Sequence, residues 1–421
     1  MKGYVTTIVG FVIAGFIGLI SCDTSNNIDP VYKQYFIKYY GEDGDQEGVD
    51  FVINSDGTVI IIGTSTFGIA KKVYLVKVDQ EGNEIWKKTL NPPINELARD
   101  IEPILNGPDA GNFVVLSNII KNETEFDIRL TVINSNGDSL KSTVFNQLLS
   151  QEGKSITPLT DGGYFVSGKT TDTDPNNAAN AGLPNPSLDL EDILIIRFQS
   201  DFTYFPFDVY RIGGSYVGSA NKIVQEGNVF YYAGDSDGLT SGNLPDNNTY
   251  ESNMFFRTFI GNPSSVSSIY SGTLTLAEEL GAFAKSSSGL YMAIGTQYDV
   301  TRTNRQLYAT TITNNFSAIQ SEGIIDAGVQ REAVAISPAG ASRFLILANE
   351  YNSAFNRDIY LRKTNALLEK DFEVKFGTPN NDDTGNQVAE LSNGDILLLG
   401  TMHITNQKKI ALIKLRSNGE F

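Results

Sequence analysis

Cys22 and His403 are each the only residue of their type in this 421-residue sequence. One cysteine cannot form an internal disulfide or a cysteine-built zinc site, and one histidine cannot supply a multi-histidine metal centre. A catalytic triad would need His403 as its base, but no G-x-S-x-G motif accompanies this residue. A single histidine in a predicted loop is more often a surface residue, and we interpret His403 in that way.

Carboxylates are the abundant chemical groups, because 49 Asp and Glu residues face 32 Lys and Arg and give a net charge of −17. Paired carboxylates can carry out glycoside hydrolysis. Acidic residues occur throughout the chain, so no pair is singled out and we assign no catalytic residue. The acidic balance disfavours nucleic acid as a partner, since its phosphate backbone would be repelled.

Two short acidic runs could bind calcium. Asp43 and Asp45 lie in Gly-Glu-Asp-Gly-Asp-Gln-Glu-Gly, and Asp235 and Asp237 lie in Asp-Ser-Asp-Gly. Alternating oxygen ligands before a glycine suit Ca²⁺, which takes six to eight hard oxygens. The EF-hand spacing is not met, however, and Asp-x-Asp-Gly is also common in turns. These four residues are the calcium candidates, with ordinary turns as the alternative, and no other cofactor is predicted.

Two long stretches rich in Asn, Asp, Pro and Gly, Lys169 to Asp192 and Asp235 to Ser252, are predicted loops. Binding concentrates in long loops on a rigid scaffold, although a solvated excursion or a protein contact is the alternative. The aromatic run Tyr204 to Tyr210 is interpreted instead as an outer strand. The candidate ligand-binding residues in and between these loops are Asp172, Asp174, Asp189, Asp235, Asp237, Tyr216 and Tyr250.

A repeated phrase positions these loops. Ser55 to Gly63 reads as a tight turn, a strand and a glycine, and seven copies of it, two of them blurred, occur in the chain. Their last residues lie 51 to 66 positions apart. Such spacing is the signature of a repeat architecture. The marker residues are Gly63, Ser117, Gly168, Gly234, Gly295, Ala348 and Gly400.

A second strand phrase, clearest at Val73 to Asp79, follows each marker, and a further strand such as Glu84 to Lys88 leads into the next unit. Each unit is thus four short strands rich in β-branched and aromatic residues, separated by Gly, Asn and Asp turns. A four-stranded sheet of this kind cannot bury both faces alone, so the pattern predicts an all-β, seven-bladed β-propeller. An open solenoid and a ring of six or eight blades are the alternatives.

The two ends of the chain complement each other. The final unit stops at Phe421 after its third strand, while the strand Gln34 to Gly41 has no partner and resembles the fourth strand Phe372 to Gly377. We therefore expect the N-terminal strand to complete the last blade and close the ring, which protects its edges. Residues 31–421 are predicted to form this single domain. Its channel is expected to be lined by Asp50, Asp100, Lys222, Glu332 and Gln387.

The first thirty residues are predicted to direct the chain to a membrane. An apolar run, Gly3 to Ile20, ends in Leu-Ile-Ser-Cys at Cys22, and a polar stretch follows. This pattern resembles the lipobox of bacterial lipoproteins, which implies a signal peptide over 1–21, lipid attachment at Cys22 and a lipidated flexible tether over 22–30. The alternative is a transmembrane anchor, since the run is just long enough to span.

The unit from Asp56 to Trp86 resembles bacterial propeller repeats, in which D-G-G-Y-hydrophobic-G precedes L-hydrophobic-K-hydrophobic-D-x-x-G-N and a Trp. Together with the lipobox, the chain is similar to surface lipoproteins of Bacteroidota. The resemblance implies a lipid-anchored, surface-exposed outer-membrane protein, although Asp23 leaves inner-membrane retention open.

The same resemblance implies an accessory role in a nutrient-uptake complex with a TonB-dependent transporter of the SusC/SusD type, where the chain would bind a glycan or peptide. A propeller glycosidase or lyase using loop carboxylates is one alternative. A structural envelope protein without a small ligand is another.

Overall fold

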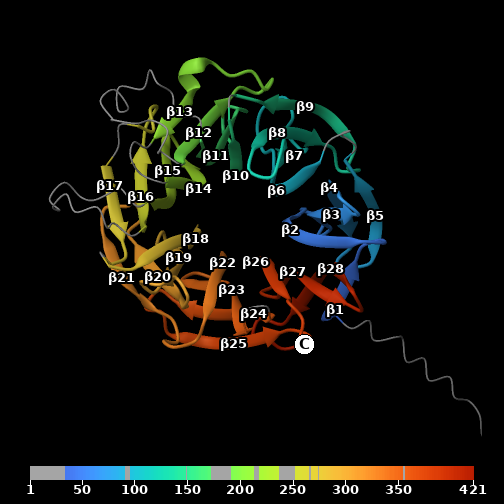
Figure 1. The fold of residues 1–421 in the computed structure, drawn as a ribbon, viewed down its shortest axis with the longest axis vertical. Coiled ribbons are helices and arrows are strands. Elements are labelled where there is room, and N and C mark those ends of the chain that lie inside the picture. The colour runs from blue at the N-terminus through green and yellow to red at the C-terminus, as the bar shows by residue number, and fades with distance from the viewer. Residues whose placement is uncertain are drawn as a thin grey trace, which may run out of the picture. The chain divides into compact units, whose positions relative to one another are not determined.

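The computed structural model describes residues 34–90, 95–147, 149–171, 191–212, 218–236, 252–264, 267–273, 275–353 and 356–421. The chain divides into two units, Met1–Gln34 and Tyr35–Phe421. The second unit contains seven four-stranded antiparallel sheets arranged around an axis (Figure 1). The prediction of a seven-bladed β-propeller is confirmed. In the described part of the chain, no helix has both the length and the apolar character needed to cross a membrane.

Each blade runs from an inner to an outer strand. Blade 1 contains β2 (Asp45–Ile53), β3 (Val59–Phe67), β4 (Ala70–Val78) and β5 (Glu84–Thr89); blade 2 contains β6 (Glu96–Pro103), β7 (Phe113–Ile120), β8 (Phe126–Ile133) and β9 (Ser139–Phe145). Blade 3 contains β10 (Gln151–Pro158), β11 (Tyr164–Thr170), β12 (Asp192–Phe198) and β13 (Val209–Ile212), with the 3-10 turn η2 (Pro206–Asp208) before β13.

Blade 4 contains β14 (Gly218–Glu226), β15 (Val229–Ser236), β16 (Asn253–Phe259) and β17 (Ser267–Ser271); blade 5 contains β18 (Ala277–Lys285), β19 (Tyr291–Tyr298), β20 (Arg305–Ile312) and β21 (Ile319–Ile324). Blade 6 contains β22 (Arg331–Ala339), β23 (Arg343–Ser353), β24 (Asn356–Asn365) and β25 (Lys370–Phe376). Blade 7 contains β26 (Thr384–Glu390), β27 (Ile396–Ile404), β28 (Gln407–Leu415) and, as its outer strand, β1 (Phe36–Tyr40).

The ring closes as predicted. Strand β1 pairs antiparallel with β28, with Phe36 opposite Lys414 and Tyr40 opposite Ile410. The Tyr40 hydroxyl donates a hydrogen bond to the carbonyl of Gly82 in blade 1, at 2.7 Å. The first strand of the domain therefore joins the last blade to the first, so neither end of the chain leaves an unpaired blade edge at this seam.

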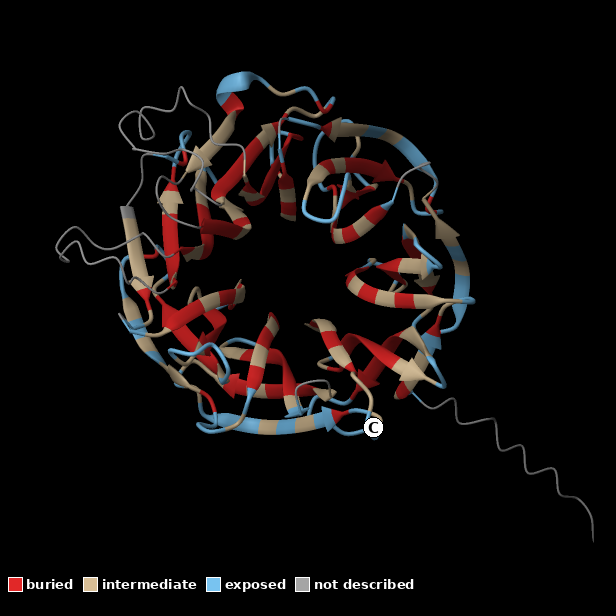
Figure 2. Ribbon diagram, in the orientation of Figure 1, coloured by how far each residue is buried: buried red, intermediate tan, exposed pale blue. Residues whose placement is uncertain are grey.

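The core consists of seven hydrophobic clusters, one at each seam between neighbouring blades. In β3, Ile60 and Ile62 pack into the seam with blade 2, whereas Val59 and Ile61 pack into the seam with blade 7. Both faces of each sheet are thus buried, as the red ribbons in Figure 2 show. This explains why the second and third strands read as continuous apolar runs instead of alternating patterns.

At six of the seven seams, one apolar side chain fills the space beside the turn between the third and fourth strands, and we call this side chain the plug. In each of these blades, the turn between the third and fourth strands contains one residue with a positive φ. Where that residue is glycine, an aromatic ring from the preceding blade lies against it: Phe36 on Gly82, Trp86 on Gly137, and Phe372 on Gly419. Where it is not glycine, the residue itself is the plug; these residues are Phe202, Phe316 and Leu368, with φ of 69°, 53° and 65°.

The aromatic run Tyr204 to Tyr210 is only partly the predicted outer strand. Tyr204 packs against Phe145 and Phe198 in the core, and strand β13 begins only at Val209. Phe205 and Phe207 stack on each other at the ends of the short turn η2 and are 49% and 73% exposed. Pro206 fixes a backbone angle that suits the start of such a turn and delays the strand.

We expect Gly82→Ala to destabilise the ring more than Gly227→Ala. Both glycines have a positive φ, of 74° and 61°, which costs an alanine about 1–2 kcal/mol. A Cβ on Gly82 would lie 2.6 Å from the Phe36 ring, whereas a Cβ on Gly227 meets nothing within 4 Å. The clash should add about 1–3 kcal/mol. Urea unfolding measures the difference, and equal losses for the two variants would contradict the role of the plug.

Candidate functional site

The connections between strands two and three and between blades lie on one side of the ring, which we call the loop face. The turns within the remaining hairpins lie on the other side, the turn face. The two predicted long loops leave the loop face from adjacent blades, since they join β11 to β12 and β15 to β16. Six candidate residues lie in these loops or near them but outside the described residues, as does Cys22: Asp172, Asp174, Asp189, Asp237, Tyr216 and Tyr250.

A β-bulge in every inner strand sets the geometry of the channel. The pairing between the first and second strands shifts by one residue at the same place in all seven blades. Bulges bend a strand and redirect its side chains. The residue before each bulge is Gly48, Ala98, Gly153, Ala220, Leu280, Ala333 or Gly385.

In six of the seven blades, the N–H of that residue is held by a side chain from the preceding blade, which we call the latch. Five latches are neutral oxygens at 2.8–3.1 Å: Thr64, Asn118, Thr296, Asn349 and Thr401. Asp235, a ligand and calcium candidate, occupies the same position and accepts from the N–H of Leu280. Burial raises the pKa of Asp235 to about 6, and nearby Glu279 adds to the shift, while Lys154 opposes it.

A second equivalent position lies two residues before the bulged pair. There, in several blades, a side-chain oxygen accepts a hydrogen bond from the backbone of the connection that enters the blade. The side-chain oxygen of Gln46 accepts from the N–H of Glu42, and that of Gln151 accepts from Gln147, each at 3.0 Å. Glu278 does the same for the N–H of Thr273, at 3.1 and 3.2 Å from its two oxygens. Because Glu278 is fully buried, its pKa is raised to about 7. The blade 4–5 seam thus carries a carboxyl group of raised pKa at both repeated positions.

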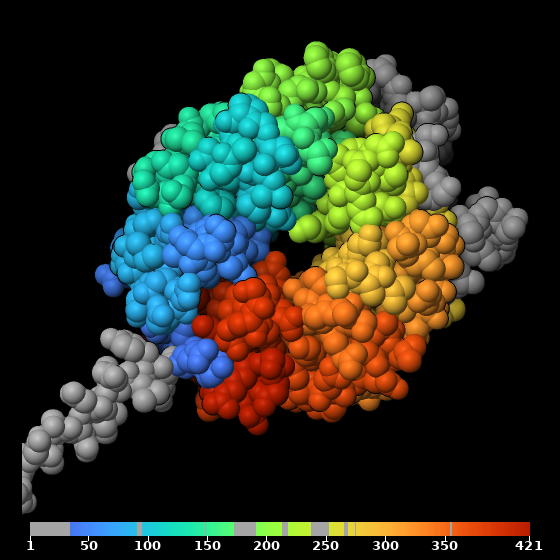
Figure 3. Space-filling model, turned by 180° about the vertical axis from the view of Figure 1, so that it is seen from behind, coloured from blue at the N-terminus to red at the C-terminus, as the bar shows by residue number. Residues whose placement is uncertain are grey.

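One cavity on the loop face lies at the mouth of the channel between blades 1, 2, 6 and 7. Its volume is about 460 Å³, in the range of small-ligand sites. Figure 3 shows the hollow at the centre of the ring. We call this cavity the mouth site. Its polar lining comprises Glu47, Thr64, Arg99, Glu332, Asn349, Arg357, Asp382, Thr384, Asn386, Thr401 and Lys408.

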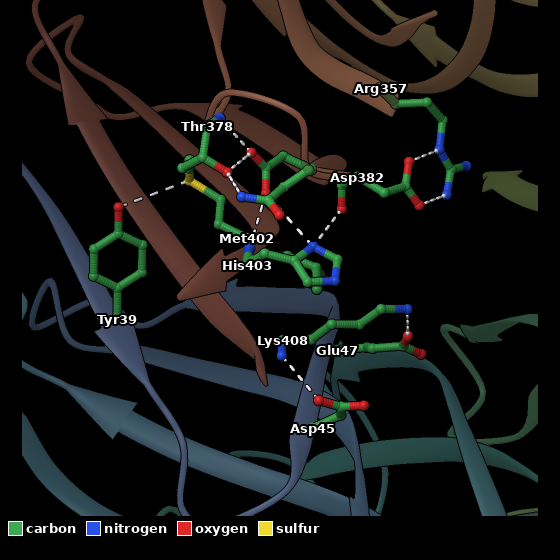
Figure 4. Close-up of polar contacts among 12 residues, drawn as sticks. Tyr39, Asp45, Glu47, Arg357, Thr378, Asp382, Met402, His403 and Lys408 are labelled. Atoms are coloured by element: carbon green, nitrogen blue, oxygen red, sulfur yellow. Dashed lines mark hydrogen bonds and ion pairs between the residues drawn. The ribbon is translucent and has the colours of Figure 1, made fainter. Parts of the chain in front are cut away.

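The charged side chains of the mouth site are held in pairs (Figure 4). Arg357 donates two hydrogen bonds of 2.6 Å to Asp382, which lowers the pKa of Asp382. Lys408 pairs with Glu47 at 2.5 Å. Glu332 accepts from the Tyr351 hydroxyl at 2.6 Å and lies 3.7 Å from Arg357.

Arg99, the remaining cation of the mouth site, pairs with Glu152 at 2.8 Å. Every cation that lines the mouth site therefore has a carboxylate partner among the described residues. The ion pairs therefore hold hydrogen-bond donors and acceptors in fixed positions around the mouth site.

His403 lies beside the mouth site, near the end of β27, and not in the loop itself. Its Nδ1 is 2.9 Å from the carbonyl oxygen of Asp382, and its backbone N–H donates to Asp383 at 2.8 Å (Figure 4). The side chain orders the connection between blades 6 and 7.

A second loop-face cavity, of about 410 Å³, lies between blades 3, 4 and 5 at the bases of the two long loops. Its charged lining is Lys154, Lys169, Glu191, Asp235, Glu279 and Arg302. Lys169 pairs with Glu191 at 2.7 Å, and Arg302 pairs with Glu279 at 3.0 Å. Asp235 is the candidate ligand residue that the structure places in a cavity.

The middle of the channel is lined by a belt of hydrogen-bonded polar side chains. Gln387 donates to Asp50 at 2.8 Å, and Asp100 accepts from Ser155 at 2.6 Å. Burial, and then the neighbouring Asp100, raise the pKa of Asp50 well above its usual range. Lys222 completes the belt by pairing with Glu102 at 2.9 Å.

Four of the five predicted channel residues therefore lie at one level. The prediction for Glu332 is wrong in position, because Ala335 occupies that level in blade 6 and Glu332 lies at the mouth. Asp50, Asp100, Lys222 and Gln387 each directly follow the bulge of their strand, whereas Glu332 lies three residues before the equivalent residue, Ala335, and so nearer the loop face.

The calcium candidates at the seam between blades 7 and 1 take part in local contacts. Asp45 accepts from the N–H of Lys408 at 2.9 Å, and the carbonyl of Asp43 accepts from Gln46 at 3.3 Å. Within the described ranges, no three His, Cys, Asp or Glu side chains come together as a metal site. Calcium binding stays a prediction for Asp43, Asp45, Asp235 and Asp237.

Sequence reasoning missed Arg357, Asp382 and Lys408 as members of the site. Arg357 and Asp382 lie 25 positions apart in sequence, and Lys408 approaches them only because the ring closes. The latch position could have been found, since a polar residue follows each of the seven markers.

A scan against protein-family models finds no match for this chain, and a search of curated proteins finds none either. Among solved structures, the extracellular region of plexin A4 superposes with a TM-score of 0.55 at 7% identity, covering 91% of this chain and 47% of that chain. This chain therefore spans about half of the plexin structure.

Two lyases are also similar in fold. An ulvan lyase, described as representing a new polysaccharide lyase family, has a TM-score of 0.52 at 10% identity, covering 90% of this chain and 96% of its own. The polysaccharide lyase Uly1 has a TM-score of 0.52 at 8% identity, covering 90% and 91%. At these identities the likeness shows the propeller fold alone.

We expect the free energy of unfolding to rise as the pH falls from 8 to 5.5. Asp235 and Glu278 have a higher pKa in the folded than in the unfolded chain, so folding binds protons in this window and is favoured by acid. Asp235→Asn and Glu278→Gln, which copy the neutral Asn118 and Gln46, should together stabilise the protein at pH 8 by about 1–3 kcal/mol and reduce the slope. Urea unfolding across pH measures both effects; an unchanged slope in the double variant would contradict this assignment.

Proposed function

We propose that this propeller is a non-catalytic binding protein that holds a glycan at the mouth site. The observation that carries the proposal is the pairing of every mouth-site cation with a carboxylate. A strongly charged ligand would have to break one of these pairs, which is costly for partly buried ions. A sugar offers hydroxyls that both donate and accept, so it can engage the paired groups without separating them.

The carboxylates at the mouth also argue for binding over catalysis. A glycosidase needs a general acid whose pKa is raised toward the working pH. In the mouth site, the pKa of Asp382 is instead lowered by Arg357. Burial, and then the hydrogen bond to Glu332, raise the pKa of Tyr351, so this hydroxyl is harder to deprotonate for use as a general base. Two proteins of similar fold are polysaccharide lyases, and this supports a polysaccharide as the ligand class by analogy of fold alone.

An enzyme remains the second candidate because of one observation, the raised pKa of Asp235 in the cavity beside the mouth site. A carboxyl that is partly protonated near neutral pH could act as a general acid, with Glu279 or Glu191 as the second carboxylate. Asp235→Asn tests this candidate well, since Asn118 and Asn349 fill the same latch position in other blades and the fold should be retained.

The chain's course supports a lipid anchor that presents the loop face. Strand β1 begins at Phe36, opposite Lys414 near the turn face, and runs toward the loop face. An acylated Cys22 would therefore be joined to the turn face through a linker with a reach of at most about 45 Å. The mouth site lies on the face of the ring opposite this attachment point. Such an arrangement suits an accessory protein that passes a glycan to a TonB-dependent transporter of the SusC/SusD type.

We expect a soluble chain starting at residue 23 to bind at least one member of a polysaccharide panel without cleaving it. The double variant Arg357→Gln/Asp382→Asn removes both partners of a pair and should weaken binding about tenfold or more. The control Arg343→Gln/Asp371→Asn removes a pair at 2.6 Å on the turn face of the same blade and should have no effect. Calorimetry measures affinity, and reducing-end and unsaturated-product assays measure turnover.

Turnover that is lost in Asp235→Asn would establish the enzyme instead. If no polysaccharide binds, or if both double variants bind equally well, the mouth site is not the glycan site. A protein that binds no panel member but covers its loop face with another protein would fit the structural envelope role.

Cells making the full-length chain should incorporate an alkyne-labelled palmitate, and Cys22→Ala should abolish the label. The Cys22-intact protein should also be recovered from native membranes, in mild detergent, with stoichiometric amounts of a TonB-dependent barrel. Mass spectrometry identifies the partners. Equal labelling of the variant would exclude lipidation at Cys22, and recovery of the protein alone would exclude the uptake complex.

A further inference from the structure

A cavity of the turn face lies at the seam where blades 7 and 1 close the ring. Its volume is about 680 Å³, and no part of the mouth site contributes to it. In Figure 1 this seam is where β1, β27 and β28 meet β2. We call it the closure cavity. It is lined by Phe36, the turn 53–57 with Val59, Asp79, Gln80, the turn 390–393, Leu397, Leu412 and Lys414.

The closure cavity exists because two turns stand apart. At other seams the turns between the first and second strands touch. A Cβ on Gly107 would lie 2.8 Å from Gly162, Thr160 donates to Gln225 at 2.9 Å, and Ser288 donates to Ala341 at 3.1 Å. At the closure seam, the corresponding turns of blades 1 and 7 are opposite walls of the cavity.

The floor of the closure cavity is apolar. Val59, Leu397, Leu412 and Phe36 belong to the hydrophobic cluster of this seam, and each is at most 8% exposed. A ligand that reaches this floor must bring an apolar body, since a polar one would lose its water without compensation.

Lys414 lines the same cavity and is 9% exposed. Its ammonium group has three donors, but it makes one hydrogen bond, of 3.3 Å, to the carbonyl of Gln80. It forms no ion pair with a described residue. Buried charges are normally paired, because taking an ion out of water is costly.

The equivalent basic residues of other blades show what Lys414 lacks. Arg197 in blade 3 pairs with Asp161 of its own turn at 2.5 Å. Lys363 in blade 6 pairs with Glu390 of the next blade at 2.9 Å. In blade 7, the position of Asp161 is held by Asn393, and the position of Glu390 is held by Ile53 of blade 1. Both carboxylate positions around Lys414 are therefore occupied by uncharged residues.

The acidic groups of the closure cavity are already engaged. Asp56 accepts from the N–H and hydroxyl of Thr58 at 2.9 and 2.6 Å. Asp79 accepts from the N–H groups of Glu81 and Asn83 at 3.0 and 2.7 Å. Glu390 is paired with Lys363. Lys414 is thus the charged group of this cavity that is left to recognise a ligand.

We propose that the closure cavity binds a small carboxylate with an apolar body, whose carboxylate pairs with Lys414 and whose apolar part lies on Phe36, Leu397 and Leu412. The ligand supplies the anion that Asp161 or Glu390 supplies in other blades. This site is separate from the mouth site, so the two ligands bind independently.

The test is calorimetry on the folded chain starting at residue 23 with two probes that share a phenyl ring: 3-phenylpropanoate and 2-phenylethylamine. The carboxylate should bind with a Kd of about 1 mM or tighter, and Lys414→Met should weaken it about tenfold or more. Lys77→Met is the matched control. Lys77 holds the same strand position in blade 1 and donates at 3.3 Å to the equivalent carbonyl, Ser135, so its loss should leave binding unchanged.

Three results would overturn the proposal: no saturable binding of 3-phenylpropanoate, equal affinity for 2-phenylethylamine, or unchanged carboxylate binding by Lys414→Met. Thermal melting without ligand provides a further readout. Lys414→Met should melt no lower than Lys77→Met, because it removes an unpaired buried charge. A larger loss for Lys414→Met would show that Lys414 serves the fold and would also overturn the proposal. The mouth variant Arg357→Gln/Asp382→Asn should bind the carboxylate normally.

Discussion

Burial of both faces of every sheet is the constraint on which this structure depends. Each blade contributes apolar side chains to two seams, as Ile60 and Ile61 do in β3, so no blade is stable without a neighbour on either side. A ring is the arrangement in which every blade has two neighbours. The last seam can form only if the final blade is complete, and this gives β1 its importance. When β1 pairs with β28, the hydrophobic cluster between blades 7 and 1 can be buried.

Because the register is the same in every blade, the side chains at equivalent positions can differ in chemical type while the fold stays the same. One position holds the N–H before six of the seven bulges, and Thr, Asn and Asp all perform this task with an oxygen. Asp235 is the one of these six latches that can bind a proton. At the second position, Gln46 and Gln151 are neutral, whereas Glu96, Glu278 and Asp383 are buried carboxyl groups. The seam between blades 4 and 5 combines a carboxyl group of raised pKa at both positions, so its stability depends on pH. The positive-φ turns follow the same logic, since a glycine under an aromatic ring and a phenylalanine with φ of 69° fill the same space.

The two faces of the ring differ in how their charges are compensated. On the loop face, the mouth site presents ion pairs such as Arg357 with Asp382, which keep donors and acceptors fixed but nearly cancel in charge. On the turn face, the closure cavity presents Lys414 over an apolar floor without a carboxylate partner. The first arrangement suits a ligand with many hydroxyls, and the second suits a ligand with one anionic group. An anchor joined to β1 would orient these two faces differently with respect to a membrane.

The sequence by itself determined the repeat, the number of blades and the strand that closes the ring, because these depend on local patterns: turn residues, apolar runs and the unmatched strand at Gln34 to Gly41. It also placed Asp50, Asp100, Lys222 and Gln387 in the channel, since equivalent positions in a repeat must lie at one level. Only the tertiary structure decided which side chains meet. Arg357 finds Asp382 across a connection, and Lys408 approaches the same cavity after the whole ring has closed. Glu332 lies at the mouth of the channel because the residue of blade 6 that is equivalent to Asp50 is Ala335, three positions further along the strand. Lys414 looks like Lys363 in sequence, and it differs only because another blade supplies Ile53 where the pairing needs Glu390.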